Sequence, residues 1–436
     1  MSTYKLLPPS KLHTTVKLPA SKSISNRALI IYALTSEHVL PQNLSDCDDT
    51  EVIIHALDYL SQHEADDRHC GITNDKLSII DIKAAGTSMR FMTAYLAATS
   101  CTHHPSLLIT GTERMKHRPI KVLVDALRYL GADIDYAGQE GFPPLRVTGR
   151  KLEGGELEVP GNVSSQFISA LLLIGPVLRN GLTLRLTGDI ISRPYIDLTL
   201  WTMREFGADA EWIAIDTIKV QPKPYVSRQY FIENDWSAAS YWYEMVALSA
   251  DPDAEVQLEG LMDGSKQGDS GVRYIFSLLG VKTLFHTRDS GVPTTVTLKK
   301  SGQRVKRLEY DFAKTPDLAQ TIVCTCCALG IPFHFTGLQT LKIKETDRIK
   351  ALMTELRKLG FELQECNGRE LIWNGGNTTS ISYPVIDTYE DHRMAMAFAP
   401  MSLVMPVAIR NPQVVTKSYP RFWEDLKSAQ FEIDEV

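Results

Sequence analysis

The segment Lys344-Glu345-Thr346-Asp347-Arg348 places two cations and two carboxylates close together in the chain. Apolar residues then recur at three- and four-residue steps as far as Gly360, which predicts an amphipathic helix with a glycine cap. The first N–H groups of a helix have no partner inside it, and the helix dipole favours anions there. The segment is therefore a candidate anion site, and an ordinary solvated first turn is the alternative.

Similar polar groups precede several apolar helical runs elsewhere in the chain. Each one alone is open to a simpler interpretation as a helix cap or a solvated charge. Pro119 suits a first helical position, which would put Arg118 at a helix mouth. Seven cations at one recurring structural position favour a substrate with several negative charges. The candidate binding residues are Lys22, Ser23, Arg27, Gly86, Thr87, Arg118, Ser164, Ser165, Gln166, Ser192, Tyr195, Lys344, Arg348, Arg393 and Lys417.

Two carboxylates could transfer protons at such a site. Asp317 falls in the first turn of the apolar run PDLAQTIVCTCCALG, where burial is expected to raise its pKa and make it a candidate base. A plain carboxylate at a helix N-terminus is the alternative for Asp317. Glu345 is the second candidate, and no residue pattern indicates a covalent nucleophile.

The chain repeats, and the repeats must position these residues. Amphipathic helices end at Gly131, Gly207, Gly280 and Gly360, roughly 75 residues apart, and two looser copies flank them. Each copy also carries a helix that is apolar nearly all round and therefore buried. These helices are expected to begin near Ser21, Gly86, Ser164, Asp235, Pro316 and Asp391. The pattern predicts an α/β fold with mixed sheets, built from six copies of two helices and several strands.

Six copies divide most simply into three and three. The proline-containing stretch 221–237 is the expected linker, with a second crossing near residues 18–20. We therefore predict one domain from residues 1–19 plus 236–436 and another from residues 20–235. If the polar helix starts converge, the site lies in the cleft between these domains.

Composition narrows the class of protein. The chain has 436 residues, is 44% hydrophobic and carries a net charge of −6, which argues against binding to nucleic acid or a membrane surface. It shows no signal-peptide pattern and no apolar run long enough to span a bilayer. Among its seven cysteines, Cys324, Cys326 and Cys327 fall in an apolar helix as expected buried thiols. We expect a cytoplasmic location, with no disulfide, metal site or cofactor.

Nine motifs follow one another along the chain: LPASKSISNRAL, AGTSMRF, RMKHRPIKVLVDAL, NVSSQF, ISRPYIDLTL, PDLA, KIKETDR, DHRMAMAF and TKSYP. On these motifs the sequence resembles, from about Leu18 to Phe422, the 3-phosphoshikimate 1-carboxyvinyltransferase (5-enolpyruvylshikimate-3-phosphate synthase) family of enolpyruvyl transferases. The resemblance implies a two-domain, inside-out α/β barrel of six βαβαββ units, three per domain, that closes over its ligands. It also implies an enzyme of the shikimate pathway, which leads to chorismate and the aromatic amino acids. We expect this enzyme to be a monomer.

The resemblance further implies transfer of the enolpyruvyl group of phosphoenolpyruvate to the 5-hydroxyl of shikimate 3-phosphate. Asp317 would then take the hydroxyl proton, and Glu345, with Lys22 near, would protonate the methylene carbon. Shikimate 3-phosphate would be held by Ser23, Arg27, Ser164, Ser165, Gln166, Ser192, Tyr195 and Lys344. Phosphoenolpyruvate would be held by Lys22, Gly86, Arg118, Gln166, Arg348, Arg393 and Lys417.

Three positions depart from the family pattern. Ala84 and Thr340 each stand where Asn is usual, and Phe91 stands where Pro usually follows Met-Arg. Ala84 and Phe91 adjoin the phosphoenolpyruvate side, so affinity for that substrate and the response to glyphosate stay open. Two alternatives remain. One is the related transferase that acts on UDP-N-acetylglucosamine, whose loop cysteine has no counterpart between Gly111 and Pro119. The other is a non-catalytic anion-binding relative.

Overall fold

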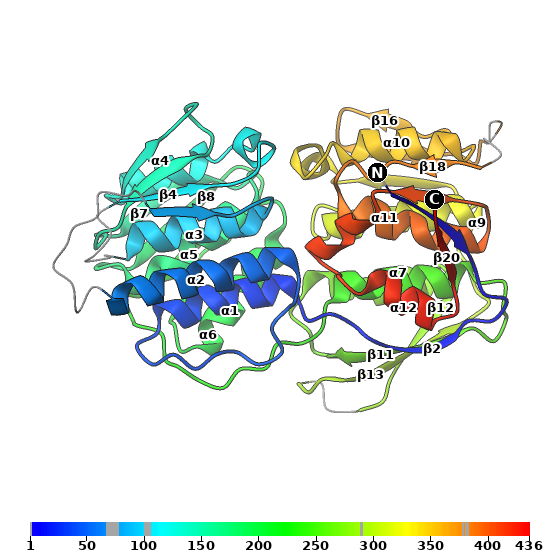
Figure 1. Cartoon of the computed structure of the whole chain (residues 1–436), viewed down its shortest axis with the longest axis horizontal. Coiled ribbons are helices and arrows are strands. Elements are labelled where there is room, and N and C mark those ends of the chain that lie inside the picture. The colour runs from blue at the N-terminus through cyan, green and yellow to red at the C-terminus, as the bar shows by residue number, and fades with distance from the viewer. Residues whose placement is uncertain (1, 67–77, 100–105, 288–290, 377–378, 380–382) are drawn as a thin grey trace. The chain divides into compact units, whose positions relative to one another are not determined.

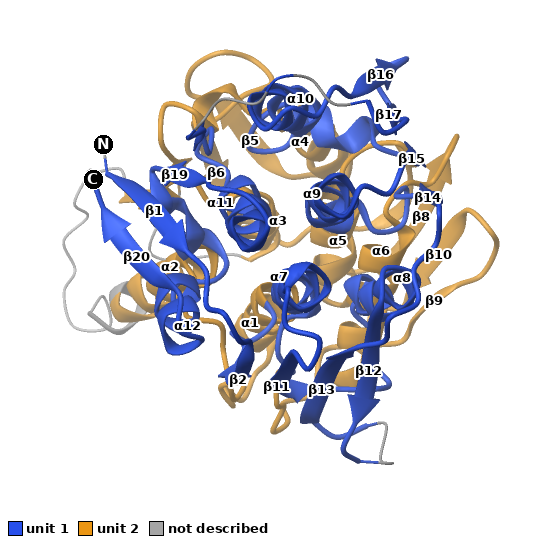
Figure 2. Cartoon of the chain, turned by 90° about the vertical axis from the view of Figure 1, so that its right-hand side faces the viewer, with its two compact units in different colours: residues 1–21, 233–436 blue, residues 22–232 orange. Residues whose placement is uncertain are grey.

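The computed structural model describes residues 2–66, 78–99, 106–287, 291–376, 379 and 383–436 (Figure 1). The chain forms two compact units, drawn in different colours in Figure 2: unit 1 is residues 1–21 with 233–436, and unit 2 is residues 22–232. The crossing segments pair with each other. Ser21 N–H donates to the Glu233 carbonyl at 2.9 Å, and Asp235 N–H donates to the Pro19 carbonyl at 2.9 Å.

Unit 2 contains two four-stranded sheets in its described part. Their strands are β3 (Ser78–Asp81), β4 (Leu107–Thr110), β5 (Asp133–Tyr136) and β6 (Leu145–Thr148), then β7 (Gly155–Pro160), β8 (Leu182–Thr187), β9 (Ala210–Trp212) and β10 (Thr217–Val220). The helices are α1 (Lys22–Leu34), α2 (Asp48–Asp66), α3 (Gly86–Ala98), α4 (Lys121–Tyr129), α5 (Ser165–Ile174) and α6 (Arg193–Glu205). Short 3₁₀ turns are η1 (Met115–His117) and η2 (Gly175–Val177).

Unit 1 contains three more such sheets in its described part. Their strands are β1 (Thr3–Leu7), β2 (His13–Lys17), β11 (Glu255–Leu261), β12 (Val281–Phe285), β13 (Thr294–Lys300), β14 (Leu308–Asp311), β15 (Phe333–Thr336), β16 (Gln364–Cys366), β17 (Glu370–Trp373), β18 (Val385–Ile386), β19 (Ala408–Arg410) and β20 (Glu432–Glu435). The helices are α7 (Trp236–Leu248), α8 (Val272–Leu278), α9 (Ala319–Leu329), α10 (Arg348–Lys358), α11 (His392–Phe398) and α12 (Phe422–Ser428). The 3₁₀ turns are η3 (Gly268–Gly271), η4 (Pro316–Leu318), η5 (Gln339–Ile343), η6 (Ala399–Leu403) and η7 (Pro412–Lys417).

All five described sheets share one pairing pattern. Each begins with a parallel pair and continues with two antiparallel pairs, for example β7–β8 parallel, then β8–β10 and β10–β9 antiparallel. The other sheets repeat this in the orders β3-β4-β6-β5, β2-β11-β13-β12, β14-β15-β17-β16 and β18-β19-β1-β20. A parallel pair needs a crossover, which a helix supplies, whereas a tight turn can join antiparallel strands. The predicted mixed sheets are therefore confirmed.

The helix starts predicted from the apolar runs are confirmed to within about one residue. The helical segments begin at Lys22, Gly86, Ser165, Trp236, Pro316 and His392. The predicted glycine stops are also confirmed, because Gly131, Gly207, Gly280 and Gly360 have φ values of 99°, 80°, 91° and 92°. A residue without a β-carbon adopts this left-handed conformation without steric cost, which lets the chain leave the helix.

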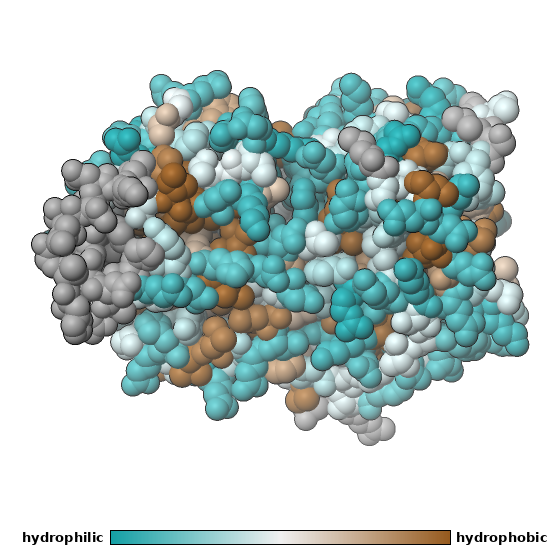
Figure 3. All heavy atoms as spheres, in the orientation of Figure 1, coloured by the Kyte–Doolittle hydropathy of each residue, from teal (hydrophilic) through white to brown (hydrophobic). Residues whose placement is uncertain are grey.

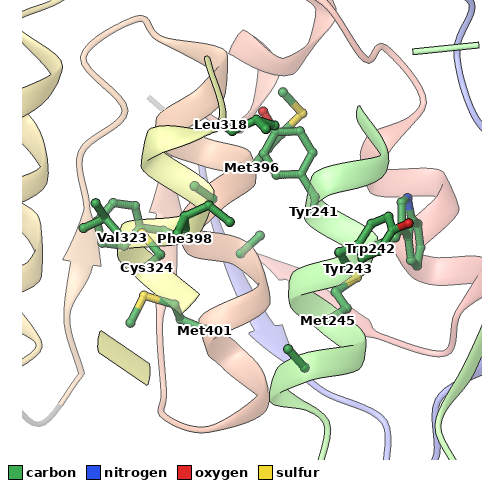
Figure 4. Close-up of a cluster of buried hydrophobic side chains, with 14 of the residues drawn as sticks. Tyr241, Trp242, Tyr243, Met245, Leu318, Val323, Cys324, Met396, Phe398 and Met401 are labelled. Carbon is green, nitrogen blue, oxygen red and sulfur yellow. The ribbon is translucent and has the colours of Figure 1, made fainter. Parts of the chain in front are cut away.

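Helices α7, α9 and α11 are buried on nearly every side, and Figure 2 shows them at the centre of unit 1 with strands around them. In Figure 4, Tyr241 of α7 lies near Leu318 of η4 and near Met396 of α11. The thiols of Cys324, Cys326 and Cys327 are buried in α9, as predicted, and burial raises their pKa. Most of the residues along these helices pack against apolar neighbours, although Glu244 of α7 and Thr321 of α9 are buried polar residues within them.

On the face seen in Figure 3, hydrophilic side chains are interspersed with small hydrophobic patches. Among the described helices, none has both the length and the apolar character needed to cross a membrane. Within the same residues, no cluster of three or more His, Cys, Asp or Glu side chains is placed to hold a metal ion.

Candidate functional site

In unit 1 the Asp317 carboxylate lies among three cations. It is 3.4 Å from Lys344 Nζ, 3.1 Å from Arg348 Nη1 and 3.1 Å from Arg393 Nη2. Asp317 sits in η4, immediately before α9, while Arg348 and Arg393 open α10 and α11. Lys344 follows η5. The starts of three segments that are far apart in the sequence therefore meet at one carboxylate.

The predicted rise in the pKa of Asp317 is wrong. Burial by itself would raise its pKa, but the charges of Arg393, Lys344 and Arg348 outweigh burial and hold the pKa well below its ordinary value. The Asp317 side chain also keeps 18% of its surface exposed, so desolvation is incomplete. Without ligand, Asp317 is an ionised carboxylate and a weak base.

Arg348 connects Asp317 to two further carboxylates. Its side chain is 2% exposed and donates to Glu345 Oε2 at 2.8 Å and to Asp391 Oδ2 at 2.7 Å. Burial would lower the pKa of Arg348, but the charges of Asp391, Glu345 and Asp317 outweigh it and raise the pKa. Three cations and three carboxylates thus balance one another in this cluster, so an anionic ligand must compete with internal partners.

Asp391 was not among the residues selected from the sequence. It caps α11, where its side chain accepts from Arg393 N–H at 2.9 Å, and it is fully buried. Arg393 reaches the Asp317 backbone carbonyl at 3.2 Å and the Tyr241 hydroxyl at 3.4 Å. Burial raises the pKa of Tyr241 to about 12, so this phenol is a neutral partner. The only sequence signal for Asp391 was its position before an apolar run.

Lys417, at the end of η7, is held by a backbone group. Its Nζ donates to the Glu390 carbonyl at 2.9 Å. Tyr389 and Glu390 both have left-handed backbone conformations, with φ of 53° and 54°. Two such non-glycine residues in succession are strained. The Tyr389 hydroxyl donates to Glu355 Oε1 at 2.7 Å, which anchors this turn and directs the Glu390 carbonyl toward Lys417.

In unit 2 the first residue of α1 is paired with a carboxylate. Lys22 Nζ lies 3.5 Å from Asp49 Oδ2, in the first turn of α2. The Asp49 carbonyl accepts from the Ser88 hydroxyl at 2.6 Å, which ties α2 to the start of α3. Asp49, like Asp391, is a carboxylate beside a predicted binding residue that was not selected from the sequence. Its partners Lys22 and Ser88 come from other helices.

The starts of α3 and α5 meet through their side chains. Gln166 Nε2 donates to Thr87 Oγ1 at 2.9 Å, and Ser164 caps α5 by accepting from Gln166 N–H at 3.4 Å. A β-carbon built on Gly86 would lie 2.4 Å from Arg118 Nη1. Gly86, Thr87, Arg118, Ser164 and Gln166 therefore form one polar group.

The predicted helix start at Pro119 is wrong. Arg118 ends the turn η1 instead, with an extended backbone (ψ 122°), and α4 begins at Lys121. The residue before a proline is restricted to extended geometry, which accounts for the backbone of Arg118, and Ile120 (φ −134°, ψ 1°) is the N-cap from which α4 starts. The Arg118 guanidinium still reaches Gly86, so the side chain lies at the start of α3 rather than α4.

Arg27 is buried among α1, α5 and α6. Its Nε donates to Thr199 Oγ1 at 2.7 Å, and Nη2 donates to Ser169 Oγ at 3.2 Å and to the Tyr195 carbonyl at 3.1 Å. Desolvation lowers the pKa of Arg27 to about 10. Ser192 precedes α6 in a left-handed conformation, and Ser165 is buried at the start of α5. The neighbouring Arg193 instead covers Trp212, 3.9 Å from its ring centre.

The Asp317 cluster of unit 1 and the polar group at the starts of α3 and α5 in unit 2 contain several of the residues in the sequence motifs, whereas Lys22, Arg27 and Lys417 have partners of their own. The sequence profile described as EPSP synthase (3-phosphoshikimate 1-carboxyvinyltransferase) matches residues 6–426. The chain belongs to the EPSP synthase family. It is 54% identical over 431 residues to the 3-phosphoshikimate 1-carboxyvinyltransferase of Bacteroides fragilis, covering 99% of this chain and 98% of the relative. The enzyme of that name from Vibrio atlanticus is 34% identical over 443 residues, covering 98% of this chain and 99% of the relative.

Solved structures agree in fold. The EPSP synthase of Acinetobacter baumannii superposes with a TM-score of 0.76 at 20% identity and covers 100% of both chains. The enolpyruvyl transferase NikO of Streptomyces tendae superposes with a TM-score of 0.69 at 14% identity, covering 100% of this chain and 99% of that one. Membership in this transferase family confirms the resemblance seen in the sequence.

Proposed function

We propose that this protein transfers the enolpyruvyl group of phosphoenolpyruvate to the 5-hydroxyl of shikimate 3-phosphate and releases phosphate. The observation that carries the proposal is the Asp317 carboxylate held by Lys344, Arg348 and Arg393, in a chain of the EPSP synthase family. Cations that already bind one carboxylate are suited to the carboxylate and phosphate groups of these substrates.

Proton transfer follows from the two carboxylates. Glu345, after taking up a proton from solvent, gives that proton to the methylene carbon of phosphoenolpyruvate with Lys22 assisting, which leaves a cationic carbon. The 5-hydroxyl oxygen attacks that carbon while Asp317 accepts the hydroxyl proton, and a tetrahedral adduct forms. The Glu345 carboxylate then takes a proton back from the new methyl group while the carbon–oxygen bond to phosphate breaks, which restores the double bond and releases phosphate.

The low pKa of Asp317 fits this role once substrate is present. Without ligand the cations stabilise its ionised form and make it a weak base. When substrate anions engage Arg393 and Lys344, they reduce the stabilisation of the carboxylate, and the pKa of Asp317 is expected to rise. Proton acceptance is thereby coupled to binding.

We assign the ligands as the family resemblance implies. Shikimate 3-phosphate takes Ser23, Arg27, Ser164, Ser165, Gln166, Ser192, Tyr195 and Lys344. Phosphoenolpyruvate takes Lys22, Gly86, Arg118, Gln166, Arg348, Arg393 and Lys417, with Thr87 beside Gly86. The hydrogen bond from Gln166 to Thr87 supports a shared location for the residues of α3 and α5.

The proposal extends to the arrangement of the chain. Six βαβαββ units would form an inside-out barrel in domains 1–19 plus 236–436 and 20–235, and these domains would close over both ligands. We further propose that the protein acts as a cytoplasmic monomer. Small-angle scattering with and without both substrates tests this part, since closure predicts a smaller radius of gyration with ligand.

The assay that tests the function measures phosphate released from phosphoenolpyruvate with shikimate 3-phosphate as acceptor. UDP-N-acetylglucosamine is the matched alternative acceptor. We expect release only with shikimate 3-phosphate. Release only with the nucleotide sugar would assign the other transferase activity, and release with neither would indicate a non-catalytic anion-binding protein.

A further inference from the structure

Arg27 is a buried cation whose described partners include no carboxylate. Its side chain bonds to the hydroxyls of Thr199 and Ser169 and to the carbonyls of Tyr195 and Ser23, the last at 2.7 Å from Nη1. Arg27 is only 4% exposed. A buried charge without a counter-ion is costly unless other groups stabilise it.

The ring of Phe91 supplies that stabilisation from a fourth helix. The Arg27 guanidinium carbon lies 5.5 Å from the centre of the Phe91 ring, and Phe91 on α3 is 1% exposed. An aromatic face attracts a cation within about 6 Å, and the attraction strengthens when water is excluded. Phe91 also differs from the proline usual at this position of the motif.

The hydrogen bonds of Arg27 leave one donor for a ligand. A guanidinium has five N–H groups, and four are used: one at Nε, two at Nη2 and one at Nη1. The helices in contact with it, α1, α3, α5 and α6, are those whose starts carry Ser23, Thr87, Gln166 and Tyr195. A small rotation of the guanidinium would therefore disturb both the free donor and its helix contacts.

We propose that Phe91 is a positioning residue for acceptor binding: its ring fixes the Arg27 guanidinium so that the remaining N–H faces shikimate 3-phosphate. This inference rests on the proposed function, because it takes that substrate as the ligand of Arg27. Phe91 itself contacts no substrate. It acts by restricting the orientation of a cation that its other partners, all neutral, hold through hydrogen bonds.

The test uses the full chain with Phe91→Leu, which removes the aromatic face but keeps an apolar side chain. Calorimetric titration with shikimate 3-phosphate alone should show about fivefold weaker binding, while kcat and the KM for phosphoenolpyruvate stay within about twofold. Phe91→Tyr, which keeps the ring, should bind like the wild type. Met92→Leu, at the next buried position of α3, is the control for packing and should also bind like the wild type.

Each outcome decides the matter. Wild-type affinity in Phe91→Leu, at a folded fraction verified by urea titration, would overturn the inference. Equal weakening in Phe91→Leu and Phe91→Tyr would do the same, since the ring would not be the cause. If Phe91→Leu does not fold, Phe91→Met replaces it, and failure of both to fold would assign Phe91 a packing role only. Failure of the wild type to bind shikimate 3-phosphate would instead refute the proposed function.

Discussion

Gly86 and Arg118 approach each other so closely that no side chain fits between them. A β-carbon on Gly86 would lie 2.4 Å from Arg118 Nη1 and 2.9 Å from Cζ. The atom in the way is the end of a flexible side chain, so a substitution would displace the guanidinium rather than the backbone. The missing β-carbon of Gly86 thus determines where the guanidinium of Arg118, a residue predicted to bind phosphoenolpyruvate, can lie.

Gly86→Ala is therefore expected to affect binding more than folding. The displaced Arg118 should raise the KM for phosphoenolpyruvate about tenfold, whereas the free energy of unfolding should change by less than about 1 kcal/mol. Steady-state kinetics and urea unfolding measure the two effects. A large loss of stability with an unchanged KM would show that Gly86 serves the backbone and not the ligand.

Replacing Asp317 should slow turnover without weakening substrate binding. Asp317→Asn removes the proposed base and also frees the nearby cations Lys344 and Arg393 from their carboxylate partner. We expect kcat to fall by at least ~10²-fold, with anionic substrates bound as tightly as before or more tightly. Glu309→Gln, at an exposed position, is the control. A kcat close to that of the wild type in Asp317→Asn would remove Asp317 from proton transfer.

Glu345 is expected to deliver the proton to the methylene carbon. In deuterium oxide the wild type should place solvent deuterium in the enolpyruvyl product, as mass spectrometry can measure. Glu345→Gln should reduce both this incorporation and kcat by at least ~10²-fold while shikimate 3-phosphate still binds. Incorporation at the wild-type rate would assign the proton transfer to another group.

The buried pair of Arg348 and Asp391 should support folding. Asp391→Ala removes a fully buried partner of Arg348 and the cap of α11. Loss of one member of a buried pair is expected to lower the free energy of unfolding by about 3 kcal/mol. Asp133→Ala breaks the exposed pair with Arg150, where both side chains are about half exposed, and should cost less than about 1 kcal/mol. Equal losses in the two variants would contradict the central place of Arg348.

Glu233 should make stability depend on pH. Burial raises its pKa from 4.5 to about 7, despite a 2.7 Å hydrogen bond from the Ser265 hydroxyl. A carboxyl group with a raised folded-state pKa stabilises the fold below its ordinary pKa, and this contribution is lost as the pH rises through about 7. Glu233→Gln should therefore gain about 2 kcal/mol relative to the wild type between pH 5.5 and 8.5. Glu259→Gln, at an exposed position, should show no such trend, and a flat difference for Glu233→Gln would refute the assignment.

Local features of the fold could be predicted from the sequence because their causes are local. Gly360 ends α10 because glycine tolerates a positive φ, and the apolar run after Pro316 marks a helix buried on all sides. The start of α4 was misplaced by two residues, because Ile120 rather than Arg118 is the residue at which the non-helical backbone ends.

The electrostatics of the site could not be predicted in the same way. The charge state of Asp317 depends on Arg348 and Arg393, which are far away in the sequence and become neighbours only in the folded unit. From the sequence, Asp391 was only the expected start of a buried helix, and its pairing with Arg348 depends on the same folding. Sequence motifs pointed to Asp317, Glu345 and the cations around them, but Asp391 and the balance of three cations against three carboxylates required coordinates.

The most direct measurement is a crystal structure of the chain with shikimate 3-phosphate and phosphoenolpyruvate, in Asp317→Asn to slow turnover. We expect shikimate 3-phosphate to contact Ser164, Ser165 and Gln166, and phosphoenolpyruvate to contact Arg118, Arg348 and Arg393. Density for either ligand on other residues, with Lys344 and position 317 facing away from the 5-hydroxyl, would contradict this expectation.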